Sequence, residues 1–153
     1  MGRGSLTKSE DAEMTVAATS EMTIENLLKT MIFDEHGLIP AIAQQHDSGE
    51  VLMMAWMNRD AVTETLKTWR CCYWSRSRQA LWRKGDTSGQ IQELVELRVD
   101  CDGDTVLLRV DQTGVACHTG RRSCFFNAVR DDAITVIADV EIDPKNLYPD
   151  SAD

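Results

Sequence analysis

Residues 91–110 read IQELVELRVDCDGDTVLLRV, and this stretch decides the fold. Apolar and polar residues alternate along residues 91–101, which is typical of a half-buried β-strand. The Asp102-Gly103 pair then favours a tight turn, and residues 105–110 return as a second apolar strand. Alternation predicts one strand face made of Val95, Leu97, Val99 and Cys101, and an opposite face made of Glu96, Arg98 and Asp100. We therefore expect an antiparallel hairpin whose cysteine and aspartates point apart.

The flanking sequence adds short strands and two helices. Strand-like runs at 38–43 and 51–57 bracket a turn at 47–50, and further runs lie at 71–76 and 125–129. Apolar residues recur at helical spacing over 24–32 and again over 59–69, where Asn58 is a suitable N-cap. These elements predict an α+β fold built on a mostly antiparallel β-sheet with a few helices.

Length and charge limit the classes of function. We expect one domain at 21–135, between a disordered N-terminal tail at 1–20 and a C-terminal tail at 136–153. A net charge of −9 argues against nucleic-acid and anionic-membrane partners, which bind mainly to excess positive charge. The longest apolar run, 51–57, is too short to cross a bilayer, and the first residues lack a secretory signal pattern. These features predict a cytoplasmic protein.

Three of the five cysteines suggest a metal site. Cys117 and Cys124 bracket the segment CHTGRRSC, and Cys101 lies in the turn of the predicted hairpin. Three thiolates with one open position suit Zn²⁺. The spacing alone leaves open that all three are buried free cysteines, because free cysteine is often a core residue.

The same turn carries three aspartates. Asp100, Asp102 and Asp104 offer the carboxylate oxygens that Mg²⁺ prefers, although an ordinary solvated turn would have the same composition. A calcium-binding EF-hand loop fits poorly, because glycine lies at the fourth rather than the sixth position and strands flank the loop.

Basic residues on this acidic chain gather in two places. These clusters suit phosphate groups, and nearby hydroxyls and tryptophans could add neutral donors and a surface for stacking on a base. An exposed basic face and core tryptophans remain the alternative. The candidate substrate-binding residues are Trp74, Arg76, Arg78, Trp82, Arg83, Lys84, Thr87, Ser88, Arg121 and Arg122.

The order of several motifs resembles one known family. They are GLIPAIAQ, EVLMMAWMN, YWSRSR, LWRKGDTSG, DCDGD and CHTGRRSCF, which run in this order from residue 37 to residue 125. In this order they resemble the phosphoribosyl-AMP cyclohydrolase family of histidine biosynthesis. The resemblance covers about residues 33–126 and leaves Cys71 and Cys72 without a role.

The resemblance implies metals and a partner. Cys101, Cys117 and Cys124 would bind Zn²⁺, and Asp100, Asp102 and Asp104 would bind Mg²⁺. The family also implies an intertwined homodimer whose zinc site is shared, with Cys101 from one chain and the other two cysteines from its partner. Few residues follow the last motif, so we expect a single activity.

The implied reaction is the third step of histidine biosynthesis. A zinc-activated water would attack C6 of the adenine in 1-(5-phosphoribosyl)-AMP, a small-molecule nucleotide, and open the ring at the N1–C6 bond. His118, beside Cys117, is the candidate proton shuttle, and a purely structural histidine is the alternative. The competing class of function is a non-catalytic, zinc-stapled dimeric binding module.

Overall fold

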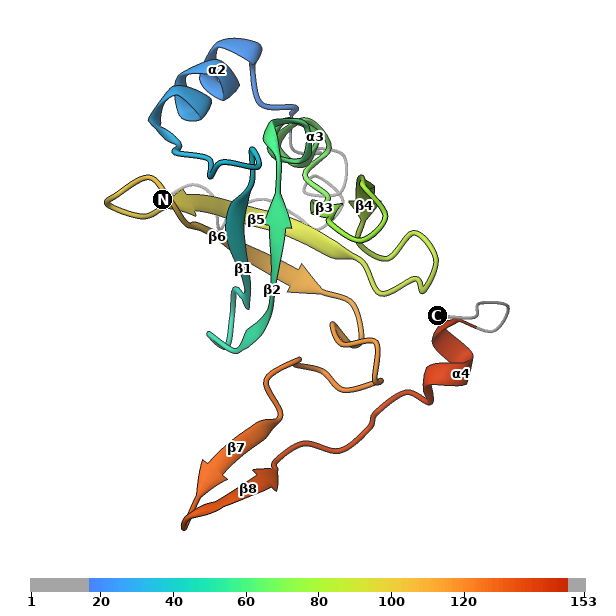
Figure 1. The fold of residues 1–153 in the computed structure, drawn as a ribbon. Coiled ribbons are helices and arrows are strands. Elements are labelled where there is room, and N and C mark those ends of the chain that lie inside the picture. The colour runs from blue at the N-terminus through green and yellow to red at the C-terminus, as the bar shows by residue number, and fades with distance from the viewer. Residues whose placement is uncertain (1–16, 149–153) are drawn as a thin grey trace, which may run out of the picture.

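A six-stranded sheet forms the body of the protein, and a two-stranded hairpin extends away from it (Figure 1). The computed structural model describes residues 17–148, so the predicted tail lies outside the described residues over 1–16 and 149–153. The elements are α2 (Glu21–Thr30), β1 (Ile39–Gln45), β2 (Val51–Met57), α3 (Arg59–Thr68), β3 (Cys72–Ser75), β4 (Ala80–Arg83), β5 (Gln92–Val99), β6 (Val106–Gln112), β7 (Asn127–Arg130), β8 (Ala133–Val136) and α4 (Pro144–Leu147).

The large sheet has the strand order β4-β3-β2-β1-β6-β5, and β7 pairs only with β8. Every pair is antiparallel except β1 with β6 at the centre, where Ala41 lies opposite Val106. This confirms the predicted α+β fold with a mostly antiparallel sheet and few helices. The parallel central pair was not predicted, and the homodimer stays a prediction.

Helix α3 follows directly from its local sequence. The side chain of Asn58 accepts a hydrogen bond from the Ala61 N–H at 2.8 Å, which satisfies a free donor of the first turn. The helix ends at Trp69, whose backbone is left-handed at φ 58°. Helix α2 is capped in the same way by Ser20, so it begins and ends earlier than the predicted 24–32.

The core lies between the helices and the central strands. Ile39, Leu52, Met57, Tyr73 and Leu108 are fully buried there. Burial alternates along β1 and β6, as expected for strands with one face on the core. This core fixes the strand ends from which the candidate site is built.

The predicted faces of β5 were wrong at one position. A β-bulge shifts the register between Leu94 and Glu96, and Val95 is 44 % exposed. The extra residue resets the alternation, so Leu94 lies inward before the bulge, and Leu97 and Val99 are half-buried after it.

The structure contains more helices and strands than the sequence indicated. Strands β4 and β8 and helix α4 were not predicted, and α4 lies within the segment taken as a C-terminal tail. No helix among residues 17–148 combines the length and the apolar character needed to cross a membrane.

Candidate active site

Two of the three candidate cysteines lie at the ends of one tight loop, residues 116–124. Backbone N–H groups of Ala116 and Cys117 donate to the carbonyls of Arg122 and Arg121, at 3.0 and 3.1 Å. Gly120 turns the loop at φ +89°, and a Cβ there would overlap the Ile142 carbonyl oxygen. Only glycine fits this close approach.

Further hydrogen bonds fix the two thiols. The Cys124 N–H donates to Leu52 of strand β2 at 2.7 Å, and the Thr119 hydroxyl donates to the Cys117 sulfur at 3.1 Å. Although part of Cys124 is exposed, desolvation of its thiol raises its pKa to about 12, with Cys117 contributing further. Two neighbouring cysteines are suitable ligands for a divalent cation such as zinc, which binds them as thiolates.

Cys101 does not join this pair within the chain. It is exposed in the turn between β5 and β6. Across residues 17–148, no group of three ligand atoms within 4.8 Å of one another includes a cysteine. One chain therefore brings together Cys117 and Cys124 and leaves Cys101 apart.

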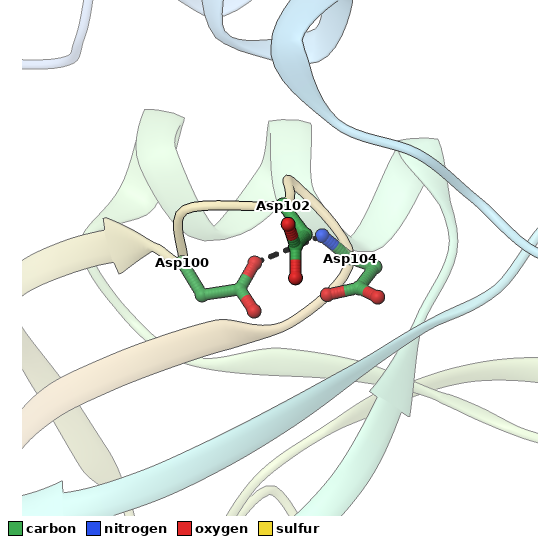
Figure 2. Close-up of side chains that lie close together, drawn as sticks. All are labelled: Asp100, Asp102 and Asp104. Carbon is green, nitrogen blue, oxygen red and sulfur yellow. Dashed lines mark hydrogen bonds between the residues drawn. The ribbon is translucent and has the colours of Figure 1, made fainter.

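The three aspartates, in contrast, form a cluster within the turn (Figure 2). Ligand oxygens of Asp100, Asp102 and Asp104 all lie within 4.8 Å of one another. The Asp100 carboxylate accepts the backbone N–H of Asp104 at 3.0 Å, and such bonds outweigh partial desolvation and lower the pKa of Asp100. The pKa of Asp104 is raised, mainly because its carboxyl group faces that of Asp100. A bound divalent cation would relieve this repulsion.

A cavity of about 950 Å³ gathers many of the predicted substrate residues. That volume lies in the range of small-molecule sites. Among the predicted residues, it is lined by Arg78, Trp82, Arg83, Lys84, Thr87, Ser88 and His118. The cavity thus joins the β4 region to the cysteine loop through His118 and Thr119.

The other predicted substrate residues lie outside this cavity. Arg76 stacks over the ring of Trp56, with 4.9 Å from the guanidinium carbon to the ring centroid, and Trp74 is half-buried opposite Trp56. Arg121 stacks on Phe126 at 4.1 Å.

Arg122 supports the fold of the loop. It donates to the Gly114 carbonyl at 2.7 Å and pairs with Glu50 at 3.3 Å. Of the two arginines that line the cavity, Arg83 is also engaged by the fold, because it donates to Glu64 at 2.8 Å.

Sequence reasoning missed several groups at the site. Thr119, Lys145 and Tyr148 line the cavity, the last two from the unpredicted α4 region. A buried chain of hydrogen bonds supports the approach to the cysteine loop. It runs from the Tyr73 hydroxyl to Gln92 (2.6 Å), from Gln92 to Gln112 (2.9 Å) and from Gln112 to the Val115 carbonyl (3.3 Å). Glutamines inside strands were the available signal, because buried amides need partners.

A small α+β domain with candidate metal ligands beside a nucleotide-sized cavity has the organisation of a small-molecule enzyme. A family model described as phosphoribosyl-AMP cyclohydrolase matches residues 53–126. A protein of that name from Alkalilimnicola ehrlichii is 69% identical over 122 residues, covering 80% of this chain and 86% of the relative. One from Rhodospirillum centenum is 67% identical over 125 residues, covering 82% and 94%. The chain belongs to the phosphoribosyl-AMP cyclohydrolase family, which confirms the resemblance in its motifs.

Proposed function

We propose that this chain hydrolyses 1-(5-phosphoribosyl)-AMP by opening its adenine ring in histidine biosynthesis. The observation that carries the proposal is a cavity that brings basic, hydroxyl and aromatic side chains next to the cysteine loop. The similarity to relatives named for this reaction supports it independently. Water would add at C6 while the N1–C6 bond breaks.

The cavity residues suggest how substrate would be bound. Arg78 and the hydroxyls of Thr87 and Ser88 would bind phosphate oxygens, because guanidinium and hydroxyl donors match an anionic acceptor. Trp82 would stack on the base. His118, which lines the same cavity beside Cys117, would move a proton between the attacking water and the departing N1 nitrogen.

Zn²⁺ is the cofactor that fits the cysteines. Cys117 and Cys124 supply two closely placed thiols, and Cys101 would complete the set. When bound, zinc would supply a Lewis acid that makes water more acidic near neutral pH. Asp100, Asp102 and Asp104 would hold Mg²⁺, a hard cation that prefers carboxylate oxygens.

A homodimer would bring Cys101 of one chain to the cysteine pair of its partner. The β7–β8 hairpin supports this proposal. Its Val129 and Ile134 are paired across the two strands and are 79 % and 78 % exposed. Exposed apolar side chains on an extending hairpin are typical of an interaction surface. A second copy of the chain would cover them and complete the zinc site.

The test is a spectrophotometric assay with phosphoribosyl-AMP on zinc-loaded protein, run beside a chelator-treated sample. We expect ring opening that chelation abolishes and that added zinc restores. A folded, dimeric, zinc-loaded protein without turnover would instead point to the zinc-stapled binding module.

A further inference from the structure

Lys84 is a buried cation next to the cysteine loop. It directly follows strand β4, and only 5 % of its surface is exposed. Its ammonium group donates to the Ala116 carbonyl at 2.6 Å and lies 5.4 Å from the ring centroid of Trp82. The contact with Ala116 places the charge at the start of the cysteine loop, residues 116–124.

A buried ammonium group normally has a carboxylate partner, because removing a charge from water is costly. No carboxylate within residues 17–148 forms an ion pair with Lys84. One carbonyl oxygen and the face of one indole compensate the charge only in part. A negative group is therefore expected next to Lys84, and no carboxylate of residues 17–148 supplies it.

The groups beside Lys84 that would be anionic in a zinc-bound protein are the cysteines of the loop. The Lys84 ammonium group binds the Ala116 carbonyl, and Ala116 directly precedes Cys117, so the charge lies at the start of the cysteine loop. Zinc is bound by cysteine as thiolate, so zinc held by Cys117 and Cys124 would place anions next to an otherwise unpaired cation. The charges of the lysine and the thiolates would then offset each other in a water-poor environment.

We propose that Lys84 is the built-in counter-charge of the Cys117–Cys124 thiolate pair, a positioning residue for zinc and not a ligand of substrate phosphate. The inference rests on the zinc site of the proposed function. It differs from the phosphate role predicted from sequence, because the ammonium group is buried and already bound to the Ala116 carbonyl. Arg78, with its exposed side chain in the same cavity, is left for the substrate.

The test compares zinc affinity in Lys84→Met, Lys84→Gln, Arg78→Met and the unsubstituted full chain, by competition with a chromogenic chelator. Methionine preserves the length of the side chain without its charge, and glutamine retains a hydrogen-bond donor. Both Lys84 variants should bind zinc roughly 10- to 100-fold more weakly, the range for groups that support metal ligands. Arg78→Met should retain zinc affinity and raise the KM for substrate.

Thermal unfolding with and without zinc separates this role from simple packing. Zinc should raise the Tm of the unsubstituted chain much more than that of either Lys84 variant. Without zinc, the variants should be at least as stable as the unsubstituted chain, because an uncompensated buried charge has been removed. Should Lys84→Met fail to fold, Lys84→Gln carries both measurements.

Two results would overturn the inference alone. One is unchanged zinc affinity together with a raised KM in the Lys84 variants, which would make Lys84 a phosphate ligand. The other is an equal loss of Tm with and without zinc, which would make the role purely structural. Failure of the unsubstituted chain to bind zinc would overturn the metal site of the proposed function and the inference with it.

Discussion

The aspartate turn and the cysteine loop are both candidate metal centres, yet they are assembled differently. The turn gathers three carboxylates from five consecutive residues, with their oxygens within 4.8 Å of one another. The loop holds Cys117 and Cys124 together while Cys101 remains exposed elsewhere. A centre formed by one turn is complete within a chain, whereas the cysteine centre depends on the fold and, as we propose, on a second copy.

The largest expected effect comes from Cys124→Ser. Removing a ligand of the proposed zinc site should lower both zinc affinity and kcat by more than about 100-fold, beyond the loss of a supporting group. Zinc content by atomic absorption and the ring-opening assay check this. Cys72→Ser is the matched control, since Cys72 is fully buried in the core and has no proposed ligand role. Equal zinc content in the Cys124 variant and the unsubstituted protein would remove Cys124 from the site.

Charged residues introduced into the β7–β8 hairpin should disrupt the cysteine centre and leave the aspartate turn intact. Val129→Asp with Ile134→Asp would place two carboxylates in the proposed dimer surface. We expect the dimer dissociation constant to rise about 100-fold, or about 3 kcal/mol, with a parallel loss of zinc. Analytical ultracentrifugation measures the first effect. The control is Met22→Asp, which alters a similarly exposed apolar residue on helix α2. Dimers that persist in the hairpin variant would contradict the β7–β8 hairpin as the dimer surface.

Gly120→Ala tests how firmly the cysteine loop depends on its close contact with the C-terminal segment. Position 120 has φ +89°, and an added Cβ would overlap the Ile142 carbonyl oxygen. The expected loss of unfolding free energy is about 2 kcal/mol, from backbone strain and displaced contacts.

Urea unfolding measures that loss against Gly37→Ala. Position 37 has a similar φ of +76° but no atom within 4 Å of the added Cβ, so only the backbone cost of about 1 kcal/mol should appear. Equal losses in the two variants would mean that the contact with Ile142 does not constrain the loop.

The smallest expected effect is that of Asp102→Asn in the turn. Unlike Asp100, the Asp102 side chain makes no hydrogen bond that holds the described turn together, so the change removes a ligand charge with little disturbance. The Mg²⁺ concentration for half-maximal activity should rise about tenfold, because ligand charge sets cation affinity. Glu35→Gln alters an exposed acid elsewhere and should leave the Mg²⁺ requirement unchanged; the same result for Asp102→Asn would argue against magnesium at the turn.

Much of the fold was predictable because its signals are local. Asn58 ahead of an amphipathic run predicted α3, and Asp102-Gly103 between apolar strands predicted the β5–β6 hairpin. The bulge at Val95 was not predictable from alternation, because it depends on how β5 pairs with β6. The parallel β1–β6 pair was missed for a similar reason, since it joins strands that are distant in sequence.

The candidate site shows the same limit. The aspartate cluster was readable from spacing alone. The cavity gathers six of the ten predicted substrate residues, together with His118, and leaves out Trp74, Arg76, Arg121 and Arg122. Whether an arginine faces a cavity, stacks on an aromatic ring or pairs with a carboxylate depends on tertiary contacts. Arg121 on Phe126 and Arg122 with Glu50 illustrate why composition could not separate these cases.

The parallel pairing of β1 with β6 also has a consequence for how the chain reaches its native state. On the ribosome, β1 to β4 emerge well before β6. Until β6 emerges, the edge of β1 that pairs with β6 has no hydrogen-bonding partner strand. Long-range pairing of this kind slows folding, because a large loop must close before the contact forms. We therefore expect the nascent chain to be most prone to aggregation until Val106–Gln112 has emerged and the sheet can close around β1.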